Sequence, residues 1–146
     1  MSEIIPGLLY LGDINQANDL IFLQSKGIQH IINVSDYPNK FRESPIHYME
    51  IDLEDTELSD INRYFTKVSR TIHNALLKHE PVMVHCNAGV SRSPTLVIAY
   101  LVQKRKYSLE AAIAHVKSKR PGINPNEGFM KQLNQRFAEQ KLPLPV

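Results

Sequence analysis

One mid-chain stretch gathers the residues best suited to chemistry, His85-Cys86-Asn87-Ala88-Gly89-Val90-Ser91-Arg92-Ser93. Cys86 is the single cysteine of the 146 residues, and an arginine follows six positions later. An apolar strand is expected to end at the cysteine and a helix to begin near the arginine. The amides between them can then turn inward around one anion, at the positive end of the helix dipole. The same field favours a thiolate, the form of cysteine that attacks phosphorus in line.

Two residues of this stretch indicate how phosphate would be held. Arg92 can fold back across the loop, where its planar fork binds two phosphate oxygens and follows the charge as the transition state forms. Gly89 allows a backbone bend or a close approach that a side chain would obstruct. Without these two residues, Cys86 would be interpreted as a small buried hydrophobic residue. The phosphate-binding amides are expected to belong to Asn87, Ala88, Gly89, Val90 and Ser91.

A departing alkoxide or phenoxide needs a proton, and an acidic segment upstream of the cysteine could supply it. Residues 51–60 read IDLEDTELSD, and the candidate acids are Asp52, Glu54, Asp55 and Glu57. Side chains alternate in direction along the preceding strand, but this alternation does not decide which of the four acids faces the cysteine. Arg92 and the amides already supply positive charge, so no metal ion and no other cofactor is expected. A zinc site is disfavoured because the sequence has no second cysteine.

Strands that alternate with helices are expected to position these groups. This order predicts an α/β fold with a central, mostly parallel sheet of about four to five strands flanked by about five to six helices. Sites on such sheets lie at the C-terminal ends of the strands. The expected strands are two short ones within 4–12, joined by Pro6-Gly7, and then 28–34, 46–51 and 82–85. The expected helices are one capped by Asp13, carrying Ala17, Leu20, Ile21 and Leu23 and ended by Gly27, and then 60–79, 93–106, 108–119 and 126–141, the last capped by Asn126.

Composition and charge narrow the class of protein further. Apolar residues make up 42% and charged residues 22%, which is ordinary for a folded soluble protein. The length fits one domain over residues 1–141, followed by a tail at 142–146, and we expect a monomer. A net charge of +2 is too weak to predict nucleic-acid binding, and no apolar run is long enough to span a membrane. A single cysteine cannot form an internal disulfide, which predicts the reducing cytoplasm, or also the nucleus.

The string HCNAGVSRSPT resembles the signature of the dual-specificity protein phosphatases at nearly every position. Further landmarks follow the family's order, namely residues 9–12 (LYLG), 27–34 (GIQHIINV), Asp55 and 124–129 (NPNEGF). The resemblance covers most of the chain and implies the phosphatase fold, with residues 1–141 as the catalytic domain. A bare cysteine-x5-arginine pattern would be weak, because unrelated phosphatases and sulfur-transferring enzymes also carry it.

The resemblance implies a role for each matching residue. Cys86 would form a phosphocysteine intermediate, and Arg92 would bind phosphate and stabilise the transition state. Ser93 would donate a hydrogen bond to the cysteine sulfur and help it leave in the second step. His85 would support the loop and would not act as a base. The family's general acid lies in the segment 51–60, where Asp55 aligns best and Asp52 is the alternative.

The implied activity is hydrolysis of phosphotyrosine and of phosphoserine or phosphothreonine in protein substrates. Enzymes with the same loop also act on phosphoinositides, phosphorylated glucans or RNA 5′ phosphates. The phosphoinositide enzymes usually carry lysines inside the loop, whereas Asn87, Ala88, Val90 and Ser91 are uncharged. A different class of function is a phospho-residue binding module without catalysis, which is disfavoured because Cys86 and Arg92 are both present.

Overall fold

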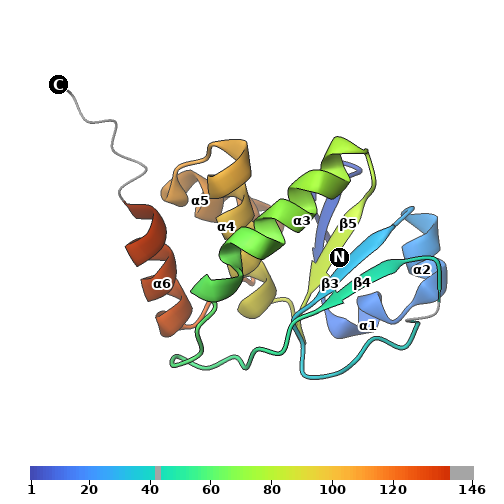
Figure 1. The fold of residues 1–146 in the computed structure, drawn as a ribbon, viewed down its shortest axis with the longest axis horizontal. Helices are drawn as coiled ribbons and strands as arrows, with labels where there is room; N and C mark the ends of the chain where they lie inside the picture. The colour runs from blue at the N-terminus through green and yellow to red at the C-terminus, as the bar shows by residue number, and fades with distance from the viewer. Residues whose placement is uncertain (42–43, 139–146) are drawn as a thin grey trace.

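The computed structural model describes residues 1–41 and 44–138 and contains a five-stranded sheet (Figure 1). The strand order is β1-β2-β5-β3-β4, and every pair is parallel except β1 with β2. The prediction of an α/β fold with a mostly parallel sheet is therefore confirmed. The strands are β1 Ser2–Ile5, β2 Leu9–Gly12, β3 His30–Asn33, β4 His47–Glu50 and β5 Val82–His85.

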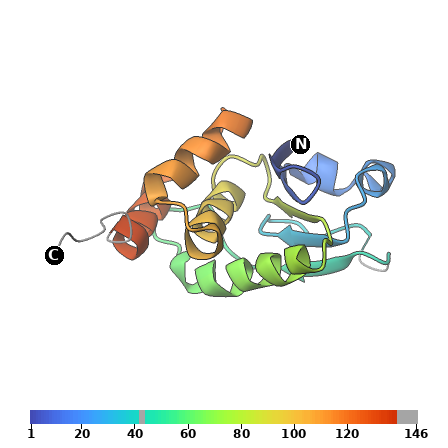
Figure 2. The ribbon, with the colours of Figure 1, turned by 90° about the horizontal axis from the view of Figure 1, so that it is seen from above.

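Helices cover both faces of this sheet. Figure 2 shows α3, in green, on one side of the strands and the two short helices α1 and α2, in blue, on the other. The helices are α1 Ile14–Ala17, α2 Leu20–Ser25, α3 Phe65–Leu77, α4 Arg92–Arg105, α5 Leu109–Lys119 and α6 Glu127–Phe137, with a 3-10 turn at Asn62–Tyr64 before α3. The predicted number of helices is confirmed within the described residues.

Alternation along β5 explains why the molecule has a core on each face. Val82 and Val84 pack into the larger cluster with α3, α4, α5 and α6, whereas Met83 points to the smaller cluster. That smaller cluster contains Ala17 of α1 and Leu23 of α2. All three β5 residues are completely buried, because successive side chains of a central strand enter opposite apolar layers. This central strand is the one that leads into Cys86.

Helix α4 lies in the middle of the helical layer. It contacts α3, α5 and α6, and every residue from Arg92 to Val102 is buried. A helix that is surrounded on all sides needs apolar residues around its whole circumference, which this sequence supplies. The N-terminus of α4 is therefore held rigidly inside the fold, beside the end of β5.

Two helices differ from the sequence predictions. The single helix expected from Asp13 to Gly27 is wrong, because α1 ends at Ala17 and a second N-cap begins α2. Asp19 accepts a hydrogen bond from the amide of Phe22 at 3.1 Å, and this new start turns Ile21 outward to 81% exposure. The helix expected from residue 60 begins instead as a 3-10 turn, and α3 starts at Phe65.

The last helix starts as predicted. Asn126 caps α6 by accepting a hydrogen bond from the amide of Phe129 at 2.9 Å, and Phe129 is completely buried. Within the described residues, α6 extends to Phe137. Its predicted end at Lys141 and the predicted tail at 142–146 lie outside the described residues.

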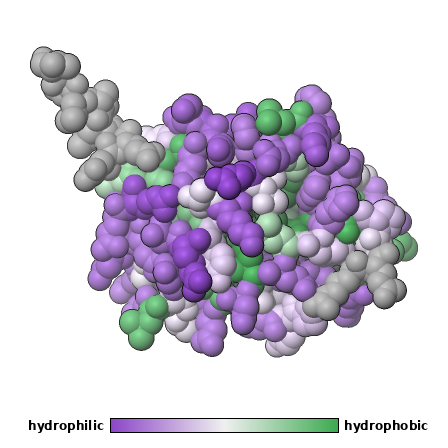
Figure 3. Space-filling view, viewed as in Figure 1, coloured by the Kyte–Doolittle hydropathy of each residue, from purple (hydrophilic) through white to green (hydrophobic). Residues whose placement is uncertain are grey.

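The face of the molecule in Figure 3 is mainly polar. The face in Figure 3 is coloured hydrophilic over most of its area, and hydrophobic colour is confined to small, separate spots. Along the described part of the chain, none of the helices combines the length and the apolar character needed to cross a membrane.

Candidate active site

The parallel strands end at one common edge of the sheet. Gly12 of β2 and Asn33 of β3 are both paired with His85 of β5, and Glu50 of β4 is paired with Asn33. The segments that follow these strands therefore leave from the same edge, as expected for a site on an α/β sheet. Three of them meet there: the cysteine loop (residues 86–91), the segment after β3, and the acid segment (residues 51–60).

Cys86 lies at the base of the cysteine loop. It is 3% exposed, and its Sγ lies 3.1 Å from the Oγ of Ser93. Ser93 is completely buried in the first turn of α4. The structure thus places Ser93 beside the sulfur, and its donation of a hydrogen bond to the departing sulfur stays a prediction. The N-terminus of α4 points its positive dipole end at the cysteine loop.

Arg120 holds the outside of the cysteine loop. Its Nε donates to the carbonyl of Gly89 at 2.9 Å, and its Nη2 donates to the carbonyl of Ala88 at 3.1 Å. Its Nη1 donates to Ser2 Oγ at 3.1 Å, which ties the same side chain to β1. One guanidinium thus fixes two consecutive loop carbonyls in an outward orientation. No pattern in the sequence indicates this role.

The neighbouring loop carbonyls also face outward. The carbonyl of Asn87 accepts from the amide of Ile14 at 3.0 Å, and that of Val90 accepts from the amide of Asn124 at 2.7 Å. The loop amides, from Asn87 to Ser91, donate to no other residue in the described part of the chain. This is the arrangement of an anion-binding loop, with its carbonyls satisfied outside and its donors available inside.

Gly89 meets both requirements that the sequence predicted for it. Its φ of +70° lies in the left-handed region, which residues other than glycine rarely adopt. A Cβ at this position would also lie 2.7 Å from the carbonyl oxygen of Gly12 and 2.6 Å from Nη2 of Arg120. The loop can therefore approach β2 closely only with glycine here.

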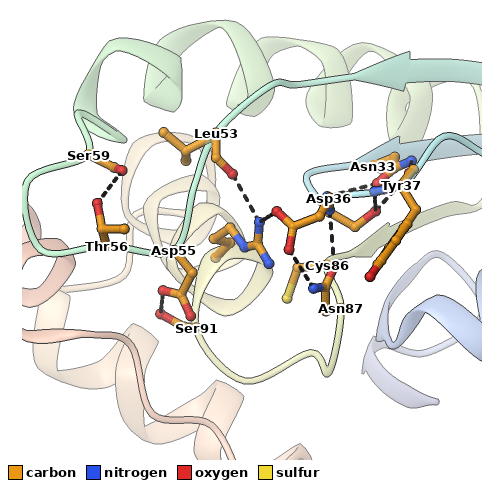
Figure 4. A network of polar contacts seen from close by, with 12 residues as sticks. Asn33, Asp36, Tyr37, Leu53, Asp55, Thr56, Ser59, Cys86, Asn87 and Ser91 are labelled. Carbon is orange, nitrogen blue, oxygen red and sulfur yellow. Dashed lines mark hydrogen bonds and ion pairs between the residues drawn. The ribbon is translucent and has the colours of Figure 1, made fainter.

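Arg92 is the first residue of α4 and is held by contacts from two other segments. The residue is 4% exposed, and its Nη1 donates both to Asp36 Oδ1 at 2.9 Å and to the carbonyl of Leu53 at 3.0 Å (Figure 4). Its Nε is buried and finds no hydrogen-bond acceptor within residues 1–41 and 44–138. A buried guanidinium N–H without an acceptor is costly unless a ligand supplies one. The geometry therefore gives Arg92 one edge bound to protein and one edge suited to an anion.

Asp55 is the acid that contacts the cysteine loop. Its Oδ1 accepts from Ser91 Oγ at 2.7 Å and from Asn126 Nδ2 at 2.8 Å. The amide of Asn126 also donates to Ser91 Oγ at 2.9 Å, which closes a triangle of polar contacts. Because both bonds use one carboxylate oxygen, the other oxygen can carry a proton. Both carboxylates are exposed, but Asp52 has no hydrogen bond to the cysteine loop among the described residues, so the geometry favours Asp55.

Helix α6 supports the acid segment along its length. Gln132 Nε2 donates to the carbonyl of Ser59 at 2.8 Å. A Cβ on Gly128 would collide with the backbone of Glu57, so this glycine permits the segment to lie directly on α6. Together with the bond from Asn126 to Asp55, these contacts hold the acid segment against α6. The sequence analysis assigned Asn126 only the capping role and missed its bond to Asp55.

His85 forms a buried polar connection to the cysteine. Its Nδ1 lies 3.2 Å from the carbonyl of Cys86, and its Nε2 lies 3.3 Å from Asn39 Nδ2. The carbonyl can only accept, so Nδ1 carries the hydrogen and Nε2 accepts from the amide. Desolvation lowers the pKa of His85 from 6.5 to about 4. A neutral, completely buried imidazole that braces the strand end fits the supporting role expected for His85.

This burial of His85 predicts a loss of stability in mild acid. Between pH 6.5 and about 4 the unfolded chain binds a proton at His85 that the folded protein does not, so stability falls as the pH falls. We expect the unfolding free energy in urea to drop by about 2 kcal/mol from this group between pH 7 and pH 5. His85→Asn does not titrate and should show a pH-dependent loss smaller by that amount. Equal losses in the two proteins would contradict the assignment.

Metal ligation finds no support in the described residues, which contain no cluster of three or more His, Cys, Asp or Glu side chains that could hold a metal ion. The expectation that the chemistry needs no metal ion or other cofactor stays a prediction.

Comparison with known proteins identifies the family. Residues 9–139 match the family model described as dual specificity phosphatase, catalytic domain. Dual specificity protein phosphatase Mpk3 of Drosophila melanogaster is 42% identical over 133 residues, which cover 90% of this chain and 32% of that protein. Dual specificity protein phosphatase 22 of Mus musculus is 38% identical over 135 residues, covering 92% of this chain and 72% of that protein.

The solved structures agree with the sequence matches. The crystal structure of the human tyrosine phosphatase-like serine/threonine/tyrosine-interacting protein has a TM-score of 0.88 and 35% identity, covering 97% of this chain and 98% of that one. The predicted phosphatase fold is therefore confirmed. The chain spans about a third of the length of Mpk3, 32%. From the family model and from relatives above 30% identity, we conclude that the chain belongs to the family of dual specificity phosphatase catalytic domains.

Proposed function

We propose that this domain hydrolyses phosphate monoesters on tyrosine and on serine or threonine of proteins, through a phosphocysteine intermediate. The observation that carries the proposal is the cysteine loop, whose amides from Asn87 to Ser91 lack acceptors in the described chain while Arg92 Nε is buried without one. Both sets of donors belong to the loop and helix start that directly follow Cys86, and they match the oxygens of a phosphoryl group.

In the first step, the Cys86 thiolate attacks phosphorus, so that an S–P bond forms as the P–O bond of the ester breaks. The amides and Arg92 stabilise the equatorial oxygens, on which charge is concentrated in the transition state. Asp55 gives its proton to the departing oxygen. Its bonds to Ser91 and Asn126 support this role, because they hold the acid against the loop that binds the phosphate.

In the second step, water attacks the phosphocysteine and releases inorganic phosphate. Asp55, now ionised, takes a proton from this water, which restores the acid for the next cycle. The S–P bond breaks with the electron pair leaving on sulfur. Ser93, at 3.1 Å from the sulfur, stabilises the departing thiolate by hydrogen bonding.

The breadth of substrate is supported by the borders of the site and by the relatives. In the described part of the chain, one of these borders is the acid segment, which connects β4 to the 3-10 turn without a helix or strand of its own. A shallow site allows the short side chains of phosphoserine and phosphothreonine to reach Cys86. Mpk3 and phosphatase 22 are both named dual specificity protein phosphatases.

Two other functions are distinguished by experiment. One is hydrolysis of a phosphoinositide, a glucan phosphate or an RNA 5′ phosphate, which the uncharged loop residues Asn87, Ala88, Val90 and Ser91 disfavour. The other is a binding module, as suggested by the word "interacting" in the name of the similar human protein. Cys86, Arg92 and Ser93 together support catalysis over binding alone.

A substrate panel tests the proposal. We expect kcat/KM for phosphotyrosine and phosphothreonine peptides to exceed that for a phosphoinositide, a glucan phosphate or an RNA 5′ phosphate by at least roughly tenfold. Turnover of phosphotyrosine peptides with none of any phosphothreonine peptide would contradict dual specificity and leave the chemistry intact. Binding of phosphopeptides without turnover would instead support the binding module. The cytoplasmic or nuclear location, the monomeric state and the domain limits stay predictions.

A further inference from the structure

Asp36 connects the arginine to the cysteine loop. It lies in the segment after β3, and its Oδ1 accepts from Arg92 Nη1 at 2.9 Å. The Asp36 side chain is 52% exposed, whereas that of Arg92 is 5% exposed. The ion pair therefore joins a carboxylate at the mouth of the site to a cation inside it (Figure 4). Sequence analysis did not select Asp36, because a carboxylate in a polar connection has no distinguishing pattern.

The second oxygen of this carboxylate is held by the cysteine loop itself. Asn87 Nδ2 donates to Asp36 Oδ2 at 2.7 Å, and the Asp36 amide donates back to Asn87 Oδ1 at 3.1 Å. This reciprocal pair fixes the carboxylate relative to the first residue after Cys86. Hydrogen bonds from Arg92 and then Asn87 also lower the pKa of Asp36, so the carboxylate stays ionised at neutral pH.

Arg92 Nη1 is thereby bound from two different segments. Asp36 accepts from one side, and the carbonyl of Leu53 in the acid segment accepts at 3.0 Å. The guanidinium is planar and rigid, so fixing Nη1 fixes the direction of the whole group. The edge formed by Nε and Nη2 is the one that a phosphate can bind in a bidentate manner. Nε on this edge is the buried atom without an acceptor.

We propose that Asp36 is a positioning residue, which holds Nη1 of Arg92 so that the Nε edge stays directed at the phosphoryl group. This inference rests on the proposed function. Asp36 does not touch the reacting atoms and acts through Arg92. An arginine with fewer restraints samples other rotamers, and misplacement of a catalytic group by about 1 Å can cost on the order of 100-fold in rate.

Asp36 helps the reaction by positioning Arg92, but its negative charge is expected to weaken substrate binding. A carboxylate near the site repels the phosphate dianion and weakens ground-state binding. Removing the carboxylate should therefore lower KM or leave it unchanged. The loss of arginine positioning should at the same time lower kcat. A residue that merely supports the fold would not produce this separation. Because Asp36 is half-exposed and borders a hollow of about 200 Å³, replacing it leaves no cavity in the core.

The test compares Asp36→Ala and Asp36→Asn with the native protein on p-nitrophenyl phosphate. Asp36→Ala removes the acceptor, and we expect kcat to fall roughly tenfold with KM equal or lower. Asp36→Asn keeps an oxygen for Nη1, and we expect kcat to fall about threefold or less. Ser35→Ala is the matched control: in the same segment it removes the Ser35 Oγ bonds to the carbonyl of Tyr37, 2.9 Å, and from the amide of Tyr37, 3.2 Å, but leaves the carboxylate. Its kcat should stay within about twofold.

A second readout does not depend on turnover. The Nε–H signal of Arg92 in a ¹H–¹⁵N spectrum, assigned by its loss in Arg92→Lys, should be sharp in the native protein and in Asp36→Asn. It should broaden or exchange faster in Asp36→Ala. If the native protein has no turnover, the proposed function fails, but this signal still shows whether Asp36 restrains the side chain of Arg92.

Three results would overturn the positioning role. The first is an unchanged Nε–H signal in Asp36→Ala. The second is a kcat that stays at the native value in Asp36→Ala, with only KM lowered, which would make Asp36 a repulsive charge. The third is an equal loss of kcat in Asp36→Ala and Asp36→Asn, which would show that the oxygen acceptor does not matter.

Discussion

Replacing Cys86 with serine is expected to lower turnover of p-nitrophenyl phosphate on the order of 10⁵-fold or more. A serine hydroxyl at this position would need a base to become a nucleophile. Among the described residues, the side chain within hydrogen-bond distance of the sulfur is that of Ser93, a hydroxyl, while His85 is bonded to the carbonyl of residue 86. The hydroxyl of the variant would therefore stay protonated and unreactive.

The fold and the anion site should survive this change. Serine is close in volume to cysteine, and the donors of the loop amides and Arg92 are untouched. We expect vanadate or tungstate to raise the melting temperature of Cys86→Ser as well as that of the native protein. Turnover above about one per cent of the native value in a preparation free of other phosphatases would contradict the nucleophile assignment.

Asp55→Asn is expected to reduce kcat by roughly 10²–10⁴-fold on esters with poor leaving groups, such as alkyl phosphates, and much less on activated aryl phosphates. The asparagine keeps an oxygen that accepts from Ser91 and from Asn126, so the acid segment retains its position. What it lacks is the proton that a poor leaving group requires. The measurement is kcat for a series of aryl phosphates of increasing leaving-group basicity.

The matched control for this series is Asp52→Asn. Asp52 is an exposed carboxylate of the same acid segment without a hydrogen bond to the cysteine loop among the described residues. The kcat of Asp52→Asn should therefore stay within about twofold of the native value across the series. If Asp52→Asn shows the steep dependence on the leaving group and Asp55→Asn does not, the acid is Asp52.

Much of this site was predictable because it is contiguous in sequence. Cys86, Gly89, Arg92 and Ser93 lie within one strand, loop and helix, whose local geometry follows from apolar periodicity and the helix dipole. The strand that leads into Cys86 was predicted with its observed bounds, since β-branched runs between turn residues have few alternatives. The mostly parallel sheet followed from the alternation of strands and helices.

The supporting contacts were not predictable, because they join residues far apart in sequence. Arg120 reaches Gly89 over 31 positions, Arg92 reaches Asp36 over 56, and Asn126 reaches Asp55 over 71. Arg120, Asp36 and Asn126 are ordinary polar residues of a connection or a helix end, so periodicity gives no information about their pairing.

The break between α1 and α2 was missed for a different reason. Asp19 and Asp13 are both competent N-caps, and apolar spacing could not show that both are used.

The most direct test of the central claim asks whether the sulfur of Cys86 carries phosphorus during turnover. Ser93→Ala removes the hydroxyl at 3.1 Å from the sulfur and should slow the second step more than the first. Acid quench of this variant within its first turnovers, followed by peptide mass spectrometry, should then find the phosphoryl group on Cys86. Phosphate release at the native rate with no phosphorylated peptide, or with phosphate on any other residue, would contradict the mechanism.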